Sequence, residues 1–181
     1  MNAVLRGAVL GLALVSPGGG AAPDVADIKV TPVVTAGQVS ASFTAPDAFT
    51  DDSHEVAKSG VPLTFTYLVE LRRPSSVWWD RTVGSATVAA KVKFDSLTAV
   101  YQVTKEQDGR VTSSRSTAKE DEMRRWATAF DAVPIPPSEA LEPNTEYYVR
   151  VRLDAHPHLR FSLWPFGRTD GDGRADFTFI R

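Results

Sequence analysis

The apolar and polar residues of this chain alternate over most of its length, which is the pattern of β-strands. Between Val61 and Leu71 an apolar side chain occupies every second position, and the residues between them are polar apart from Leu68. Successive side chains of a strand point to opposite faces, so this run predicts one buried and one mostly solvated face. The same alternation predicts further strands over 86–94 and 99–103.

A hairpin is predicted at the beginning of the strand-rich region, and a single closing strand at its end. The runs 27–35 and 39–43 are separated by Ala36-Gly37, which is a turn signal. Pro32 in the first run is typical of an edge strand or a bulge. The run 175–181 predicts the closing strand, with its two phenylalanines facing inward.

A short helix is predicted over 51–59. Thr50 can cap its N-terminus, acidic residues fill its first turn, and Gly60 can end it. Val56 and Ala57 would then face inward. His54 lies among acidic residues, so we expect it to be solvated.

A longer helix is predicted over 118–130, where the apolar residues change to helical spacing. They form one stripe along the predicted helix: Met123, Trp126, Ala127 and Phe130. Thr117 and Glu120 match a capping box. Acidic residues precede basic ones, as the helix dipole favours. We expect this helix to pack one side onto a sheet.

The segment 141–151 carries the best signal for the type of β fold. It resembles the entry into the sixth strand of fibronectin type III domains, where a tyrosine at a corner bonds to the nearby backbone. That tyrosine would be Tyr147. With the strand pattern, this resemblance predicts a mainly β fold, namely an immunoglobulin- or fibronectin III-like β-sandwich with one long inserted helix and one short helix.

The order of segments along most of the chain resembles that of a known family. Residues 60–63 open a long strand that ends in 70–74, Trp78-Trp79-Asp80 follows, and after a meander and a helix comes the strand 147–153. This order is similar to domain of unknown function 4390, an uncharacterised family of exported bacterial proteins, with a departure around 161–174. The resemblance implies export and a single β-rich domain, and it implies no activity.

The first residues predict export. Arg6 precedes an apolar run over 8–15, and small residues behind a proline follow it, which is the layout of a signal peptide. The run is shorter than the roughly 20 residues that span a bilayer. We therefore expect a signal peptide at 1–21 and one β-sandwich domain at 22–181, without a transmembrane helix, in the periplasm or extracytoplasmic envelope. Cleavage after Ala21, cleavage one residue later and retention as an anchor stay open.

Composition and motifs exclude several classes of chemistry. The chain has no cysteine, which excludes a disulfide scaffold and a cysteine nucleophile. It has 20 basic and 22 acidic residues without a basic stripe, so we expect no nucleic-acid partner. A Gly-x-Ser-x-Gly elbow, a phosphate-binding glycine loop before a helix and a His-Glu-x-x-His helix are all missing from the sequence.

Two groups of residues are candidate metal ligands. Asp154, His156 and His158 alternate, so in an extended segment they would point the same way, as zinc ligands could. They continue the polar face of Glu146, Tyr148, Arg150 and Arg152, which we expect to be solvated, so a solvated strand end is the alternative. Asp170, Asp172 and Asp176 are spaced as in the calcium loops of exported repeat proteins, but Arg168 stands where a further ligand is usual. The alternative for this second group is a glycine-rich hairpin turn.

Aromatic residues in predicted loops are candidates for a partner surface. They are Trp78, Trp79, Trp164 and Phe166. They could form an exposed apolar patch or cap the ends of the sandwich.

The function expected from the sequence is that of an exported, non-enzymatic envelope protein that binds or supports an unknown protein or envelope component. One alternative is a hydrolase whose carboxylates meet only in the folded state. The other is a calcium-dependent binding module that uses the Asp170–Asp176 segment; apart from calcium, no cofactor is expected.

Overall fold

The computed structural model describes residues 26–77, 79–154 and 170–180. Within them the fold is mainly β, with ten strands, two α-helices and one short 3-10 helix. In chain order the elements are β1 (Ala26–Asp27), β2 (Lys29–Thr35), β3 (Gln38–Thr44), η1 (Pro46–Ala48), α1 (Asp51–Lys58), β4 (Leu63–Arg73), β5 (Arg81–Asp95), β6 (Val100–Gln107), β7 (Arg110–Thr117), α2 (Glu120–Thr128), β8 (Ala129–Pro134), β9 (Thr145–Asp154) and β10 (Asp170–Phe179).

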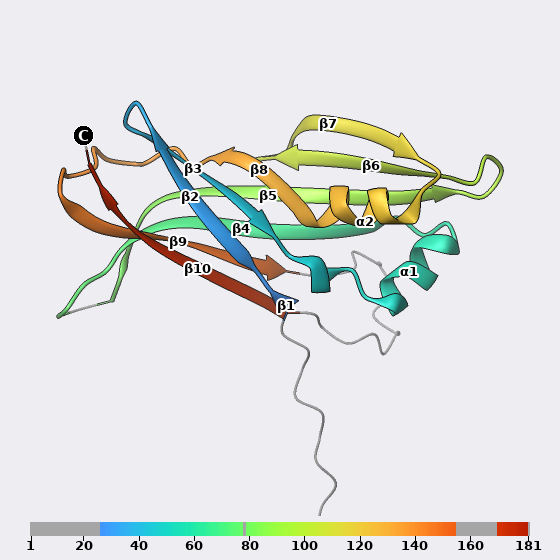
Figure 1. The fold of residues 1–181 in the computed structure, drawn as a ribbon, viewed down its shortest axis with the longest axis horizontal. Coiled ribbons are helices and arrows are strands. Elements are labelled where there is room, and N and C mark those ends of the chain that lie inside the picture. The colour runs from blue at the N-terminus through green and yellow to red at the C-terminus, as the bar shows by residue number, and fades with distance from the viewer. Residues whose placement is uncertain (1–25, 78, 155–169, 181) are drawn as a thin grey trace, which may run out of the picture.

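The strands form a seven-stranded and a three-stranded sheet (Figure 1). The larger sheet has the order β1-β10-β9-β4-β5-β6-β7, and its pairs are antiparallel except for β1 with β10. The smaller sheet, β2-β3-β8, crosses one face of the larger one. One hydrophobic cluster joins the two sheets, so the core lies between them.

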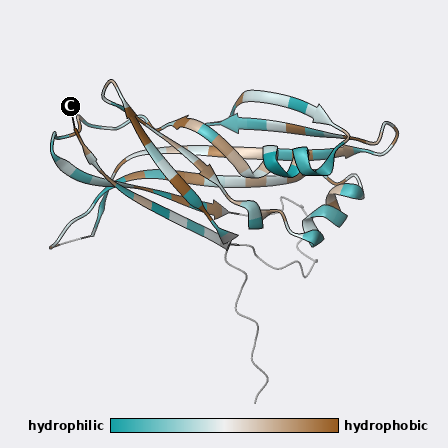
Figure 2. Cartoon of the chain, viewed as in Figure 1, coloured by the Kyte–Doolittle hydropathy of each residue, from teal (hydrophilic) through white to brown (hydrophobic). Residues whose placement is uncertain are grey.

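Tyr67 of β4 lies at the centre of this core. It is fully buried, and its ring contacts Phe43 of β3 and Phe130 of β8 at centroid distances of 5.1 and 5.3 Å. The alternation predicted for β4 and β5 is confirmed, because their inward residues are buried while polar residues lie between them. Figure 2 shows this alternation along the strands, and hydrophilic residues cover most of α1 and α2.

The predicted opening hairpin is confirmed. β2 and β3 pair in a continuous antiparallel register, and Ala36 and Gly37 connect them with φ of 49° and 79°. Both central residues therefore have the positive φ that a tight two-residue hairpin turn requires. Pro32 lies in β2 at the edge of the smaller sheet, where its missing N–H breaks no ladder.

The short helix α1 is also confirmed, but His54 on it is not solvated as predicted. The Ser53 N–H donates to Thr50 Oγ1 at 3.2 Å, and Gly60 follows the helix with φ of 84°. His54 is buried, and its Nε2 lies 2.8 Å from Glu120 Oε2 and 3.2 Å from the Tyr101 hydroxyl. Because α2 and β6 approach this side of α1, a position that is polar in sequence is covered in the fold.

The long helix α2 is shorter than the predicted 118–130. It ends at Thr128, and Phe130 reaches the core from β8, where its ring stacks on Phe43 at 4.9 Å. The predicted capping box is absent, since Thr117 Oγ1 donates to Glu122 Oε2 at 2.8 Å and makes no cap to the helix N-terminus. Phe130 is buried as a residue of β8, but its spacing from Met123 and Trp126 also fits a helical stripe. The apolar pattern therefore extends the predicted helix past its actual end at Thr128.

Two strands have no counterpart in the sequence prediction. β7 is the outermost strand of the larger sheet, and its residues are polar on both faces except for an exposed Val111. β8 is only six residues long and ends at Pro134. Neither strand shows the apolar alternation that marks the central ones.

Tyr147 is buried at the beginning of β9, as predicted. The backbone N–H of Glu142 donates to its hydroxyl at 3.0 Å, and its ring makes an edge-on contact with Phe179 at 6.5 Å. The corner therefore ties the loop before β9 to the end of β10.

The closing strand β10 begins at Asp170, five residues before its predicted start. The Asp170–Asp176 segment is consequently an extended strand paired with β9, and neither the calcium loop nor the hairpin turn expected there is formed. Gly173 faces the junction of β1 and β2: a Cβ atom on it would lie 2.2 Å from the carbonyl oxygen of Ile28. Close packing of two backbones thus explains this glycine.

Candidate functional site on the outer face of the larger sheet

A hollow of about 510 Å³ opens on the face of the seven-stranded sheet that points away from the core. We call it the Arg72 hollow, after the residue at the end of β4. Its lining residues are Arg72, Trp79, Asp80, Tyr148, Arg150, Asp172 and Arg174. They come from β4, the β4–β5 loop, β9 and β10.

The register of three neighbouring strands brings these side chains together. Arg72 is opposite Tyr148, and Arg150 is opposite Arg174. Residues two apart in a strand share a face, so Tyr148 and Arg150 point outward together, as do Asp172 and Arg174. The pairing of β9 between β4 and β10 therefore builds the hollow.

Tyr148 and Asp80 form the floor of the hollow. The Tyr148 hydroxyl donates to Asp80 Oδ2 at 2.7 Å, and the Arg174 guanidinium lies 3.7 Å from the centre of the tyrosine ring. Tyr148 is consequently only 3% exposed, although it belongs to the face that the sequence predicts to be solvated. Burial raises the pKa of Tyr148, and its hydrogen bond to Asp80 acts in the same direction.

Asp80 is held in its ionised form. The hydrogen bond from Tyr148 lowers its pKa, and the backbone N–H of Ser75, which donates to Asp80 Oδ1 at 3.0 Å, lowers it further. Both donors favour the carboxylate over the protonated acid. Asp80 therefore lacks the raised pKa of a general acid at neutral pH.

The carboxylates of β10 are engaged by arginines. Arg150 donates to both oxygens of Asp172 at 2.8 Å, and Arg174 donates to Asp176 at 2.6 and 3.1 Å. Such forked pairs use the oxygens that a cation would need. Within the described residues, no group of three or more His, Asp or Glu side chains is placed to hold a metal ion.

Arg72 contributes an unpartnered donor. Its Nη2 donates to the backbone carbonyl of Asp80 at 2.9 Å, while its buried Nε has no hydrogen-bond partner among the described residues. A buried donor without an acceptor is unfavourable, so an added acceptor near this guanidinium would be stabilised.

Trp79 stands at the rim of the hollow, fully in solvent. It is 92% exposed, and nearby Val77 is 77% exposed. Of the predicted aromatic patch, this places Trp79 on the surface, whereas Trp78, Trp164 and Phe166 lie outside the described residues.

Of the predicted metal ligands, His156 and His158 also lie outside the described residues. For Asp154 and Asp170 only the backbone is described, and the two residues pair across β9 and β10.

The sequence also shows to which family the chain belongs. The sequence model of a family described as a domain of unknown function matches residues 23–157, which is most of the chain. The chain belongs to the DUF4390 family. No curated protein and no solved structure matches it.

The DUF4390 match contains only part of the Arg72 hollow. It includes Arg72, Trp79, Asp80, Tyr148 and Arg150, whereas Asp172 and Arg174 of β10 lie beyond it.

Within the described parts of the chain, no helix has both the length and the apolar character needed to cross a membrane.

Sequence reasoning identified Trp79, Asp172 and Asp176 as candidates but missed the arginines and Tyr148. The available signal is the alternation of charged residues along 146–152, a pattern that is typical of a solvated strand face. Only the pairing of β9 with β10 shows that these charges meet opposite charges and a tyrosine.

Proposed function

We propose that this DUF4390 chain is an exported, non-enzymatic binding module that holds a protein partner on the outer face of its larger sheet. Trp79 would be the anchor residue, and the arginines and aspartates of the Arg72 hollow would form the polar surroundings.

The exposure of Trp79 carries this proposal. Tryptophan is highly buried on average in folded proteins, so a side chain that is 92% exposed is unusual. Tryptophan, tyrosine and arginine are the residues most enriched at the energetic centres of protein interfaces. Here Trp79 lies beside Tyr148 and three arginines in one hollow.

The chemistry of the hollow supports binding over catalysis. Asp80 is kept ionised by two donors, and Asp172 is neutralised by the fork of Arg150. Hydrolysis by paired carboxylates needs one group that stays protonated near neutral pH. A protein partner needs only complementary charges and an apolar anchor.

Export is the second part of the proposal. It is supported by Arg6, the apolar run 8–15 and the small residues that follow. Fractionation of cells, with N-terminal sequencing of the recovered protein, tests it. We expect a chain that starts near residue 22 in the extracytoplasmic fraction; an unprocessed chain in the cytoplasm would contradict this part alone.

The immunoglobulin- or fibronectin III-like character of the sandwich is likewise a proposal. It is supported by the Tyr147 corner. The described sheets, with seven strands in one and three in the other, depart from the four-and-three division of a constant-type immunoglobulin domain. Any such likeness is therefore local to the entry of β9.

Position-specific photo-crosslinking tests the binding proposal. A photoreactive amino acid is placed at position 77 or at position 97, which leaves Trp79 in place; Val77 is 77% exposed two residues before Trp79, and Leu97 is 95% exposed in the turn at the other end of β5. We expect a discrete crosslinked species from position 77 in intact cells and none from position 97. Trp79→Ala should abolish co-purification of that species, whereas Leu97→Ala should preserve it; equal results at both positions would refute the proposal.

A further inference from the structure

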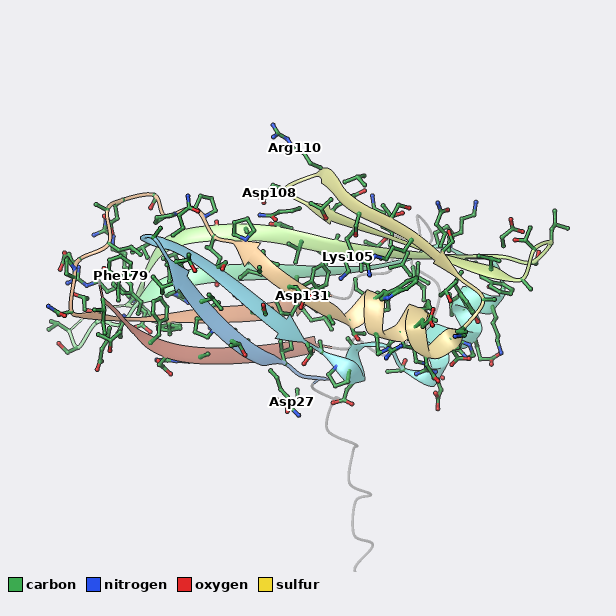
Figure 3. The ribbon with its side chains drawn as sticks, turned by 45° about the horizontal axis from the view of Figure 1, so that its top comes forward. Asp27, Lys105, Asp108, Arg110, Asp131 and Phe179 are labelled. Atoms are coloured by element: carbon green, nitrogen blue, oxygen red, sulfur yellow. The ribbon has the colours of Figure 1, made fainter. Side chains whose placement is uncertain are left out.

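A second hollow lies on the opposite face of the larger sheet, between β6, β7, α2 and the start of β8. Its volume is about 260 Å³. We call it the Lys105 hollow; its lining residues are Val103, Lys105, Ser113, Arg115, Arg125, Trp126, Ala129 and Asp131. Figure 3 shows Lys105 and Asp131 close together there, with Arg110 pointing away at the end of the β6–β7 hairpin.

The hollow exists because the larger sheet is wider than the smaller one. Val103 and Lys105 follow the core-facing Tyr101 at alternate positions of β6, and they pair with Arg115 and Ser113 of β7. The smaller sheet contains only β2, β3 and β8, so α2 covers this part of the core face instead. Polar side chains on a core-facing strand surface thus line an open space.

Among the described residues, positive charges outnumber negative ones in this hollow. Lys105, Arg115 and Arg125 are three cations, against the single carboxylate of Asp131. Among the described residues, none of the three cations forms an ion pair with a carboxylate. The Arg72 hollow is different, because Arg150 and Arg174 there are each engaged by an aspartate.

Lys105 is held in place within the hollow. Its Nζ donates to the backbone carbonyl of Ala129 and lies 4.5 Å from the centre of the Phe130 ring. Burial lowers the pKa of Lys105, Asp131 opposes that effect, and Arg115 adds to it. An ammonium that is partly stripped of water, close to a second cation, is stabilised by an added anion.

An aromatic surface adjoins these cations. Trp126 of α2 is half-buried, and the Arg115 guanidinium lies 5.5 Å from the centre of its ring. A guanidinium at this distance from the face of an indole is attracted to the ring, which favours its placement beside Trp126. Carboxylates and phosphates fit the N–H fork of a guanidinium with two hydrogen bonds.

We propose that the Lys105 hollow binds a small molecule that carries one oxyanion group, a carboxylate or a phosphate, on an aromatic or apolar body. The oxyanion would lie between Lys105 and Arg115, and the body would lie against Trp126. The volume is close to the lower end of the roughly 300–1,000 Å³ typical of small-molecule pockets, which limits the ligand to a compact one.

Titration of the full chain with phenyl phosphate and with benzoate tests this proposal and separates the two oxyanions. Calorimetry or the NMR shift of the Trp126 indole gives Kd for each probe. We expect saturable binding of at least one probe and none of benzyl alcohol, which has the ring without the charge. Inorganic phosphate should bind more weakly than phenyl phosphate because it leaves the indole uncovered.

Two variants of one strand provide the matched comparison. Arg115→Ser removes a lining cation, whereas Arg110→Ser removes the same charge from the same strand outside the hollow. We expect Arg115→Ser to raise Kd roughly tenfold, the equivalent of one charge-assisted hydrogen bond, and Arg110→Ser to change it less than about twofold. Asp131→Asn should lower Kd by removing the opposing charge.

Two results would overturn the proposal. One is the absence of saturable binding of either probe to the intact chain. The other is an equal loss with Arg110→Ser and Arg115→Ser, which would indicate nonspecific attraction to a basic surface. Urea unfolding of both variants verifies that each remains folded. Because Trp79 lies on the other face of the sheet, the outcome is independent of the partner proposed above.

Discussion

Two buried tyrosines should respond oppositely to replacement by phenylalanine. Tyr67→Phe should raise the free energy of unfolding, and Tyr147→Phe should lower it. The Tyr67 ring lies at the core centre between Phe43 and Phe130, but its hydroxyl has no hydrogen-bond partner among the described residues. Tyr147 is equally buried, and its hydroxyl accepts the Glu142 N–H at 3.0 Å. The chemical change is the same, so only the surroundings of the hydroxyl differ.

The magnitudes follow from those surroundings. A buried polar group without a partner costs about 1–3 kcal/mol, whereas a small void left in a core costs at most about 1 kcal/mol. Tyr67→Phe should therefore raise the free energy of unfolding by about 1 kcal/mol. Tyr147→Phe should lower it by about 1 kcal/mol, since the Glu142 N–H loses its acceptor but can reach water at the exposed loop.

Urea unfolding followed by circular dichroism measures both changes. With a slope of about 2 kcal/mol per molar urea, the midpoints should move roughly 0.5 M in opposite directions. The pH dependence gives a second readout. Burial raises the pKa of Tyr67 above its reference value of 10.0, so the folded state binds the phenolic proton more tightly than the unfolded state. The parent should then lose stability as the pH rises above 10, and Tyr67→Phe should lose less.

A clear loss of stability in Tyr67→Phe would refute the reasoning, because it would mean that the hydroxyl has a partner, such as a buried water. An unchanged midpoint in Tyr147→Phe would show that the corner hydrogen bond contributes nothing.

Three further predictions concern other parts of the molecule. Gly173→Ala should cost about 1–3 kcal/mol by overpacking against the backbone that crosses β10, and added calcium should not alter this loss in urea melts. Met123→Ala should cost about 2–5 kcal/mol in thermal or urea unfolding because Met123 is fully buried, and Trp126→Ala, at a half-buried position, should cost less than Met123→Ala. Tyr148→Phe removes the main cause of the lowered Asp80 pKa, so its stability deficit should be full at pH 6. The deficit should shrink as the pH falls below the reference pKa of 3.8, because Asp80 is then protonated first in the variant and only at lower pH in the folded parent. A constant deficit from pH 6 to 2 would contradict the assignment.

The sequence predicted the central strands well because their two faces lie in different environments. In β4 and β5 one face is buried in the core and the other faces solvent, so apolar and polar residues alternate, and the alternation is visible without a structure. Tyr147 is predicted instead from the local resemblance of 141–151 to a fibronectin III strand entry, and its hydrogen bond joins residues only five apart in sequence. Local determinants of this kind can be predicted from a single chain.

The candidate sites depended on pairings between distant segments, and these could not be predicted. Tyr148 lies at an outward position of β9, so its burial under Arg174 requires knowledge that β10 pairs with β9 in that register. His54 is buried because Glu120 of α2 and Tyr101 of β6 approach it. In each case the polar residue follows the sequence rule for a solvated face, and a partner far along the chain changes its environment.

Neither β7 nor the Lys105 hollow could be predicted from the sequence, and the physical reason is the same for both. Alternation identifies a strand only where a second apolar layer covers one face. The seven-stranded sheet extends beyond the three-stranded one, so the core-facing positions of β7, Ser113 and Arg115, need not be apolar. A strand in that position therefore shows no alternation of apolar and polar residues, and its polar residues on the core-facing side can line a ligand site. The part of the larger sheet that extends beyond the smaller one thus explains both why β7 has no apolar alternation and why Lys105 and Arg115 line an open hollow.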